Sequence, residues 1–459
     1  MVTTLESPHA RDIESLLHPM TNILTMEEEG PLIIEEGHGC YVRDSEGNEY
    51  LEGMAGLWST SLGFDNERLI QAVINQMRKL PTYHTFLGRS NFAAIELAER
   101  LLAIAPVPMS KVWFANSGSE ANDHMVKFVW YYNNALGRPE KKKIIAREGG
   151  YHGIAVSSGS LTGLPLMHKG FDLPIANVVH TGSHHHYRYA EAGESEEMFA
   201  SRRAAELEEL IVEEGPETVA AFVAEPIMGA GGAVMPPRTY FEKVQAVLRK
   251  YDVLMVADEV ITGFHRTGNT FACETFGIEP DIMITAKALS SAYLPISAVL
   301  LNEKVYGPIR EFSIENSMLA TGFTYSGHPV PAAVAVETLK VYEEIDIGAH
   351  VRAVSGRAQE RLQALATHPL VGEAQGVGLI GGVELVKDKE SKENFDPEVA
   401  NYCGDAALRH GVILRPCAGK RIAFCPPLII EESEIDVLFD ALEGALDDTL
   451  EHVRVSGLI

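Results

Sequence analysis

The sequence predicts an α/β protein: a mostly parallel sheet flanked by helices, followed by a smaller α+β unit. Between about residues 66 and 328, short apolar runs alternate with helical stretches, and this alternation is typical of a parallel sheet. The remaining C-terminal part has long helical stretches around "GGVEL" (381–385) and "VILRP" (412–416), which fits the second unit. The predicted strands are "KVWFA" (111–115), "KIIAR" (143–147), "NVVH" (177–180), "VAAFVA" (219–224), "VLMVA" (253–257), "IMIT" (282–285) and "SAVLL" (297–301).

A hairpin precedes this alternating region, and a helix opens it. Residues 31–52 are predicted to form a small hairpin, with turn-forming residues from Ser45 to Asn48. The stretch 66–80 has apolar residues at helical spacing, which predicts an amphipathic helix. Its apolar face consists of Leu69, Ile70, Val73, Ile74 and Met77.

Composition excludes several classes of protein. The formal net charge of the 459 residues is −26, which argues against a nucleic-acid or anionic-membrane partner. No apolar stretch approaches the ~18 residues that span a bilayer, and the N-terminus lacks the pattern of a secretory signal. The five cysteines have no C-x-x-C spacing, so neither a disulfide framework nor a zinc site is predicted. We therefore expect a reduced, cytoplasmic protein with no metal.

Ionisable residues and glycine-rich turns follow the predicted strands. In open parallel sheets, ligands bind beyond the carboxyl ends of the strands. Three strands are followed directly by Glu225, by Asp258 and by Ala286-Lys287, and two others by segments 116–120 and 149–153. Collecting Glu, Asp and Lys at one sheet edge brings no benefit to a structural protein, so the pattern predicts a catalytic site.

The stretch "NSGSEAND" reads as a turn entering a long helix. Ser117 and Glu120 have the S-x-x-E spacing of a capping box. Gly118 and Ser119 would then present backbone N–H groups at a helix start, which suits a phosphate. The alternative is an ordinary helix cap without a ligand.

Asp258 and Lys287 each have a structural alternative. Asp258 at the end of an apolar strand fits a buried carboxylate paired with an arginine such as Arg266, and a Lys287–Asp258 pair would explain both residues. The combination of a phosphate cradle, a carboxylate and a lysine is more specific. Pyridoxal phosphate needs an anion site for its phosphate, an acid partner for its ring nitrogen and a primary amine for its aldehyde.

Two other motifs are set aside. "GVGLIG" (376–381) matches G-x-G-x-x-G, but a dinucleotide site needs a strand before it and a helix after it, and a strand-like run follows instead. His184, His185 and His186 are adjacent and cannot all face one metal ion, so we expect a polar loop there.

Seven ordered stretches give the chain its family resemblance, from about Pro31 to about Ile430. They are "NSGSEAND", "YHG", "AEPIMGAGG", "ADEVITGFHRTG", "TAK", "GFTYSGHP" and "LRPCAGKRIAFCPP". The chain resembles class III aminotransferases, which are fold-type-I pyridoxal-phosphate enzymes, and within them the amine:pyruvate branch or ω-transaminases. The resemblance implies a transaminase that moves an amino group from a primary amine or ω-amino compound to pyruvate, in a ping-pong mechanism through pyridoxal and pyridoxamine phosphate. With this fold we divide the chain into a small-domain segment (1–60), a large cofactor-binding domain (61–329) and the rest of the small domain (330–459).

The resemblance also implies roles for individual residues. Lys287 is the Schiff-base lysine and Asp258 the partner of the ring nitrogen, and these two are catalytic. Thr324 completes the phosphate site from the other subunit of a homodimer or dimer of dimers. Arg415 is a mobile arginine for the substrate carboxylate. Further cofactor contacts are Ser117, Gly118, Ser119, Tyr151, His152, Glu225 and Val260, and further substrate contacts are Leu57, Trp58, Phe86 (from the partner chain), Tyr151 and Ala230.

Three family glycines are replaced, and the reaction has rivals. Ala292, Ser297 and His265 stand where the family has glycine, and a positive φ at His265 or Ala292 would be strained. The alternatives are a class III aminotransferase that uses 2-oxoglutarate or another keto acid, a related aminomutase or racemase, a decarboxylating transaminase, and a non-catalytic scaffold. Plain packing is the alternative role for Trp58, Phe86 and Ala230, and a fixed salt bridge is the alternative for Arg415.

Overall fold

The computed structural model describes residues 7–459; residues 1–6, the start of the predicted 1–60 segment, lie outside the described residues. Its centre is a seven-stranded sheet of order β4-β10-β9-β8-β7-β5-β6, in which β10 alone runs antiparallel to its neighbours. All seven predicted strands are confirmed to within one residue at either end. They are β4 (Lys111–Ala115), β5 (Lys143–Arg147), β6 (Val178–Thr181), β7 (Val219–Ala224), β8 (Leu254–Asp258), β9 (Ile282–Thr285) and β10 (Ser297–Leu301).

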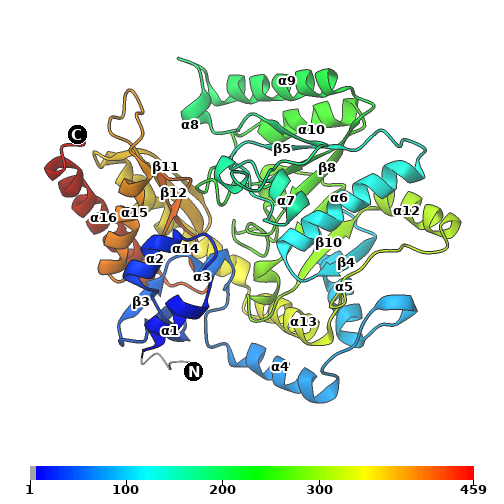
Figure 1. The fold of residues 1–459 in the computed structure, drawn as a ribbon, viewed down its shortest axis with the longest axis horizontal. Helices are drawn as coiled ribbons and strands as arrows, with labels where there is room; N and C mark the ends of the chain where they lie inside the picture. The colour runs from blue at the N-terminus through cyan, green and yellow to red at the C-terminus, as the bar shows by residue number, and fades with distance from the viewer. Residues whose placement is uncertain (1–6) are drawn as a thin grey trace.

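Helices cover both faces of this sheet (Figure 1), which confirms the predicted α/β class. Alternate residues of β8 explain the two layers: Met255 and Ala257 enter one apolar cluster, whereas Leu254 and Val256 enter the other. The first cluster includes residues of α5 (Phe92–Ile104), α9 (Glu196–Glu214), α10 (Tyr240–Lys250) and α13 (Pro329–Glu344). The second includes residues of α6 (Gly118–Ala135), α7 (Val156–Leu161) and α12 (Glu303–Glu315).

Two smaller sheets lie beside the large one. The first combines both ends of the chain, because β3 pairs in parallel with β13, Leu51 opposite Val412. Figure 1 accordingly shows the blue N-terminal segment beside the orange and red C-terminal helices. The first sheet contains β1 (Ile34–His38), β2 (Tyr41–Asp44), β3 (Glu49–Glu52) and β13 (Val412–Ile413). The second is antiparallel and contains β11 (Val371–Val377), β12 (Ile380–Leu385), β15 (Arg421–Phe424) and β14 (Arg415–Cys417).

The remaining helices are short or lie around the smaller sheets. None of the helices in the described residues is long and apolar enough to cross a membrane. They are α1 (Pro8–Ser15), α2 (Ile23–Glu29), α3 (Ala55–Trp58), α4 (Glu67–Lys79), α8 (His186–Tyr189), α11 (Ala272–Phe276), α14 (Ile347–Ala364), α15 (Pro397–Arg409) and α16 (Glu432–Val455). Four 3₁₀ turns are η1 (Phe86–Gly88), η2 (Pro165–Met167), η3 (Lys287–Ser290) and η4 (Leu365–Thr367).

Three local expectations meet different outcomes. The predicted hairpin has three strands, β1 to β3, and its turn is closed by the Asp44–Asn48 backbone hydrogen bond. The predicted helix at 66–80 is α4, capped by Asn66, but Ile70, Ile74 and Met77 are exposed on the single chain. "GVGLIG" spans the β11–β12 hairpin: the preceding "EAQ" does belong to a strand, contrary to expectation, but a strand and not a helix follows the motif, as expected.

Candidate active site

Five carboxyl ends of strands share one edge of the large sheet. Because β10 is antiparallel to both β4 and β9, β4 runs in the same direction as β9, β8, β7 and β5. The segments that follow these five strands therefore meet at this edge. They contain the predicted helix start at 117–119, the turn at 149–153, Glu225, Asp258 and Lys287.

Asp258 is buried and is held by three donors. Its Oδ2 accepts hydrogen bonds from Asn122 Nδ2 at 2.9 Å and from His152 Nδ1 at 2.8 Å, and its Oδ1 accepts from the backbone N–H of Val260 at 3.1 Å. Neither structural alternative for Asp258 applies. Arg266 donates instead to the carbonyls of Leu379 and Pro426, and no lysine or arginine among the described residues pairs with Asp258.

Lys287 follows β9 after one residue and begins the turn η3 with a positive φ of 52°. Its amine makes no hydrogen bond or ion pair within residues 7–459, so it is not the structural partner of Asp258. Burial lowers the pKa of Lys287 from 10.5 to about 8, against the opposing pull of the Asp258 charge. A large share of Lys287 side chains is therefore neutral near pH 8, as a nucleophilic amine requires.

The start of α6 presents free N–H groups. Ser117 caps the helix by accepting the N–H of Glu120 at 3.2 Å. The Glu120 carboxylate bonds the N–H and the amide of Asn116 rather than of Ser117, so only half of the predicted capping box forms. No acceptor among the described residues takes the N–H of Gly118 or Ser119. A Cβ at Gly118 would lie 3.3 Å from the Val260 side chain, so glycine lets Val260 approach the helix start.

Glu225, Tyr151 and His152 complete the inner wall. Glu225 is buried, and its two oxygens accept the N–H groups of Tyr151 and Gly229 at 2.8 and 2.9 Å. Burial raises the pKa of Glu225, and the Asp258 charge adds to this while His152 and the two N–H groups oppose it. The Tyr151 side chain is half-buried, and burial raises the pKa of its phenol.

Arg415 is half-buried at the same site. Its positive charge contributes to lowering the pKa values of both Tyr151 and Lys287, so it belongs to the same electrostatic environment. Within the part of the chain that the structure describes, Arg415 forms no ion pair, and the alternative of a fixed salt bridge is not supported. Ala423, which lies opposite Arg415 in the β14–β15 ladder, belongs to the apolar cluster that includes Trp58.

The other predicted substrate contacts are dispersed on the single chain. Trp58 is buried against Met54, Ile227 and Cys425, among others. Ala230 is half-buried, whereas Leu57 and Phe86 are 59% and 40% exposed. Thr324 is exposed in the turn after Phe323. The chain by itself therefore does not bring Thr324 to a buried site.

The three replaced glycines behave differently. His265 and Ala292 have φ values of 73° and 61°, so both adopt the left-handed conformation that favours glycine. Ser297 has no positive φ and instead donates a hydrogen bond to the carbonyl of Ser117 at 2.8 Å. Ser297 thereby ties the first residue of β10 to the cap of α6.

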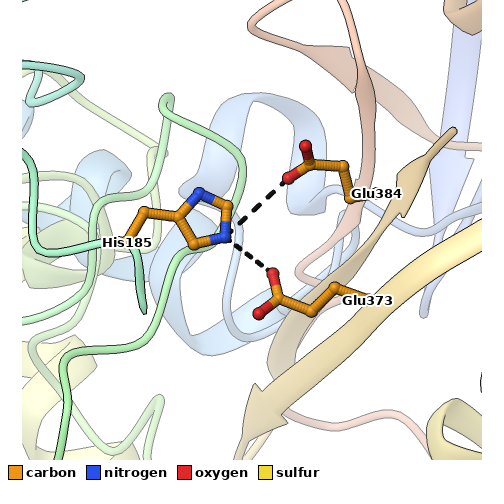
Figure 2. Close-up of side chains that lie close together, drawn as sticks. All are labelled: His185, Glu373 and Glu384. Carbon is orange, nitrogen blue, oxygen red and sulfur yellow. Dashed lines mark hydrogen bonds and ion pairs between the residues drawn. The ribbon is translucent and has the colours of Figure 1, made fainter. Parts of the chain in front are cut away.

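His184, His185 and His186 do not form the polar loop that we expected. His184 and His185 are buried, and His185 Nε2 lies 2.7 Å from Glu373 and 3.8 Å from Glu384 (Figure 2). Local sequence patterns do not predict this contact, because Glu373 lies 188 residues from His185 in the chain. His185, Glu373 and Glu384 each offer one atom that could ligate a metal ion, and these atoms lie within 4.8 Å of one another.

A guanidinium already satisfies these two carboxylates. Arg421 Nη1 lies 2.7 Å from Glu373 and 2.8 Å from Glu384, and Arg188 also pairs with Glu384. Burial acts to raise the pKa of Glu373, but the His185 hydrogen bond and the Arg421 charge lower it to about 2. The cluster is therefore an ion-pair network that joins the 184–188 segment to the small antiparallel sheet.

Comparison with known proteins agrees with the geometry of the sheet edge. The family model "Aminotransferase class-III" matches residues 24–446. The chain belongs to the class III aminotransferases.

Named relatives within this family differ in their described substrates. A probable gamma-aminobutyrate transaminase 2 (mitochondrial) of Oryza sativa subsp. indica is 49% identical over 442 residues, covering 96% of this chain and 89% of that protein. The solved omega transaminase of Pseudomonas jessenii in complex with PMP is 54% identical, with a TM-score of 0.96 over 97% of this chain and 99% of that one. A thermostable omega transaminase variant is 53% identical, with a TM-score of 0.96 over 97% of this chain and all of that chain. In that variant a tryptophan, a phenylalanine and an arginine were replaced for the asymmetric synthesis of enantiopure bulky amines.

Class III aminotransferases use pyridoxal phosphate, and the residues of this aminotransferase fit it. Asp258 is a buried carboxylate with no lysine or arginine partner among the described residues, which suits a protonated ring nitrogen. The N–H groups of Gly118 and Ser119 suit the phosphate, and Lys287 is a buried amine with a lowered pKa. Asn122 is the polar site residue that the sequence reasoning missed. Its signal was its position one helical turn after Gly118, on the same face of the helix.

Proposed function

We propose that this aminotransferase transfers an amino group from a primary amine or an ω-amino compound to pyruvate, giving alanine. The observation that carries the proposal is the half-buried Arg415, whose charge acts on Lys287 and Tyr151 and which has no carboxylate partner within residues 7–459. Burying the pyruvate carboxylate without a partner costs several kcal/mol, and a guanidinium can meet it with two parallel hydrogen bonds.

One pocket must accept two unlike substrates. The amine donor and the keto acid react in turn at the same cofactor position. The half-buried Tyr151 supplies apolar surface for an aromatic or alkyl amine, whereas a fixed arginine would oppose such a group. An Arg415 that is free of salt bridges can turn away when the substrate lacks a carboxylate.

The cofactor, when bound, supplies an aldehyde for the amino group and a ring that withdraws electrons from the substrate carbon. The Lys287 amine would serve as the base that accepts the proton from that carbon. The Asp258 carboxylate would favour a protonated ring nitrogen. Two unit charges ~4 Å apart attract by roughly 4 kcal/mol at an effective dielectric of ~20, enough for up to ~3 decades in rate if it acts at the transition state.

The second candidate acceptor is 2-oxoglutarate, and 4-aminobutanoate is a specific candidate donor. The names of the Oryza and Solanum relatives favour 4-aminobutanoate, which is an ω-amino compound within the proposed class. Its distal carboxylate would use Arg415 in the donor half-reaction.

A matrix of donors and acceptors tests the proposal. We expect alanine formation with pyruvate from 1-phenylethylamine and from 4-aminobutanoate, at rates well above those with 2-oxoglutarate. If turnover with 2-oxoglutarate is faster than with pyruvate for every donor, the acceptor is 2-oxoglutarate and the proposal of pyruvate is wrong. An isomer of the donor, formed without any keto acid, would indicate an aminomutase or racemase.

A further inference from the structure

Asn122 is buried on α6, and its amide group connects two parts of the site. Nδ2 donates to Asp258 Oδ2 at 2.9 Å and to the carbonyl of Gly118 at 3.2 Å. Gly118 is the first residue of α6, beside the free N–H groups, and Asp258 is the last residue of β8. A single amide therefore bridges the groups that would hold the phosphate and the ring nitrogen of the cofactor.

The two oxygens of Asp258 are not equivalent. Oδ2 accepts from both Asn122 and His152, and a carboxylate oxygen has about two acceptor positions. Oδ1 accepts only the N–H of Val260, at 3.1 Å. One acceptor position therefore remains on Oδ1, and the geometry assigns this oxygen to the ring nitrogen.

We propose that Asn122 is a positioning residue that orients the Asp258 carboxylate plane so that Oδ1 faces the ring nitrogen. The same amide also fixes the position of this carboxylate relative to the start of α6. The terminal torsion of an aspartate is broad and roughly two-fold, so the plane is defined only by its hydrogen bonds. Losing the Asn122 donor leaves Oδ2 with His152 alone, so the carboxylate plane is held by two hydrogen bonds instead of three and is less firmly fixed. This inference rests on the proposed role of Asp258.

The test compares two cofactors that differ only at the ring nitrogen. Pyridoxal phosphate and 1-deazapyridoxal phosphate carry the same phosphate and aldehyde, but the second has carbon in place of the nitrogen. The dissociation constants of both cofactors from the full-length apoenzyme are measured by fluorescence titration. The constant for 1-deazapyridoxal phosphate divided by that for pyridoxal phosphate isolates the Asp258 interaction. We expect Asn122→Ala to reduce this ratio by roughly five- to tenfold, the size expected of the net contribution of one typical hydrogen bond.

Asn133→Ala is the matched control. Asn133 is buried on the same helix, and its Nδ2 donates only to the backbone carbonyl of Val129 at 2.9 Å. We expect Asn133→Ala to leave the ratio unchanged. If Asn122→Ala weakens both cofactors by the same factor, Asn122 is a packing residue and the inference is wrong. If Asn122→Ala does not fold, as judged by thermal unfolding of the apoenzyme, Asn122→Ser is titrated against the same criterion.

Asp258→Asn separates the inference from its premise. If Asp258→Asn reduces the ratio while the Asn122 variants keep it, the role of Asp258 stands and the positioning role of Asn122 fails. If Asp258→Asn also keeps the wild-type ratio, Asp258 does not meet the ring nitrogen, and both assignments fail together.

Discussion

At the scale of the residue, burial makes Lys287 reactive. Desolvation lowers its pKa from 10.5 to about 8, even though the Asp258 charge acts to raise it. Attachment to an aldehyde needs the neutral amine, so we expect covalent incorporation of pyridoxal phosphate into the apoenzyme to accelerate as the pH rises through about 8 rather than through 10.5. Borohydride trapping followed by peptide mapping measures this rate at Lys287. In Asp258→Asn the inflection should move to lower pH, because the charge that favours the ammonium is gone. Trapping at a different lysine would overturn the assignment.

Arg415 gives the second prediction at this scale. We expect Arg415→Leu to lower kcat/KM for pyruvate by about 100-fold, since removing one partner of a buried charge pair costs at least ~2 kcal/mol. The rate with a carboxylate-free aldehyde acceptor should change little, because no anion then needs a partner. Arg409→Leu, an exposed arginine on α15, is the control. Equal losses with both acceptors would point to a structural arginine and remove the main support for pyruvate.

At the scale of the element, alternating strands and helices were readable from the sequence, and so was the chemistry at the strand ends. Glu225, Asp258 and Lys287 end continuous apolar runs, and chain direction alone places such ends at one edge. The contacts of Asn122 and His185 were not readable. Asn122 meets Asp258 across 136 residues, and His185 meets Glu373 across 188. Such pairs depend on how layers pack, which local periodicity does not encode.

The turn between β3 and α3 begins at a carboxyl group, that of Glu52, whose protonation changes near neutral pH. Glu52 is buried, its Oε1 accepts the N–H of Met54 at 2.9 Å, and the chain then passes through positive φ at Ala55, Gly56 and Trp58. Burial raises the pKa of Glu52 from 4.5 to about 7, because it outweighs the N–H groups that stabilise the anion. The folded state therefore holds this proton longer than the unfolded state does.

From this we predict how Glu52 affects stability. Between pH 4.5 and about 7 the folded state binds more protons at Glu52, so the contribution of this group to stability falls as the pH rises. Relative to wild type, Glu52→Gln should gain on the order of 2 kcal/mol in unfolding free energy between pH 4.5 and 8. Urea unfolding at several pH values measures this. Glu49→Gln, a partly exposed carboxylate on the same strand, is the control and should not reproduce the gain. A Glu52→Gln curve parallel to that of wild type would contradict the prediction.

At the scale of the whole molecule, the single chain exposes apolar side chains of the kind that a partner subunit covers. Phe86, Leu87 and Phe92 lie within one short segment and are 40%, 79% and 82% exposed. Such clusters mark interaction sites. The loop that carries Thr324 is anchored to α6: Thr321 bonds His124 and Lys127, and Phe323 packs on His124. Thr324 itself faces outward. A second copy of the chain would cover these residues, and we predict a homodimer in which Thr324 completes the phosphate site of the partner.

Mixing two inactive variants tests this shared site. Lys287→Ala removes the amine of its own subunit, and Thr324→Trp would block the phosphate site of the other subunit. A heterodimer of the two variants would contain one intact site, made of Lys287 from the Thr324→Trp chain and Thr324 from the Lys287→Ala chain. Random pairing should therefore restore roughly a quarter of wild-type activity when the variants are refolded together, because half of the dimers are mixed and each has one working site of two. Each variant refolded alone should stay inactive. If the mixture also stays inactive while size-exclusion chromatography shows mixed dimers, each site is built from one chain. In that case, the outward position of Thr324 needs another explanation.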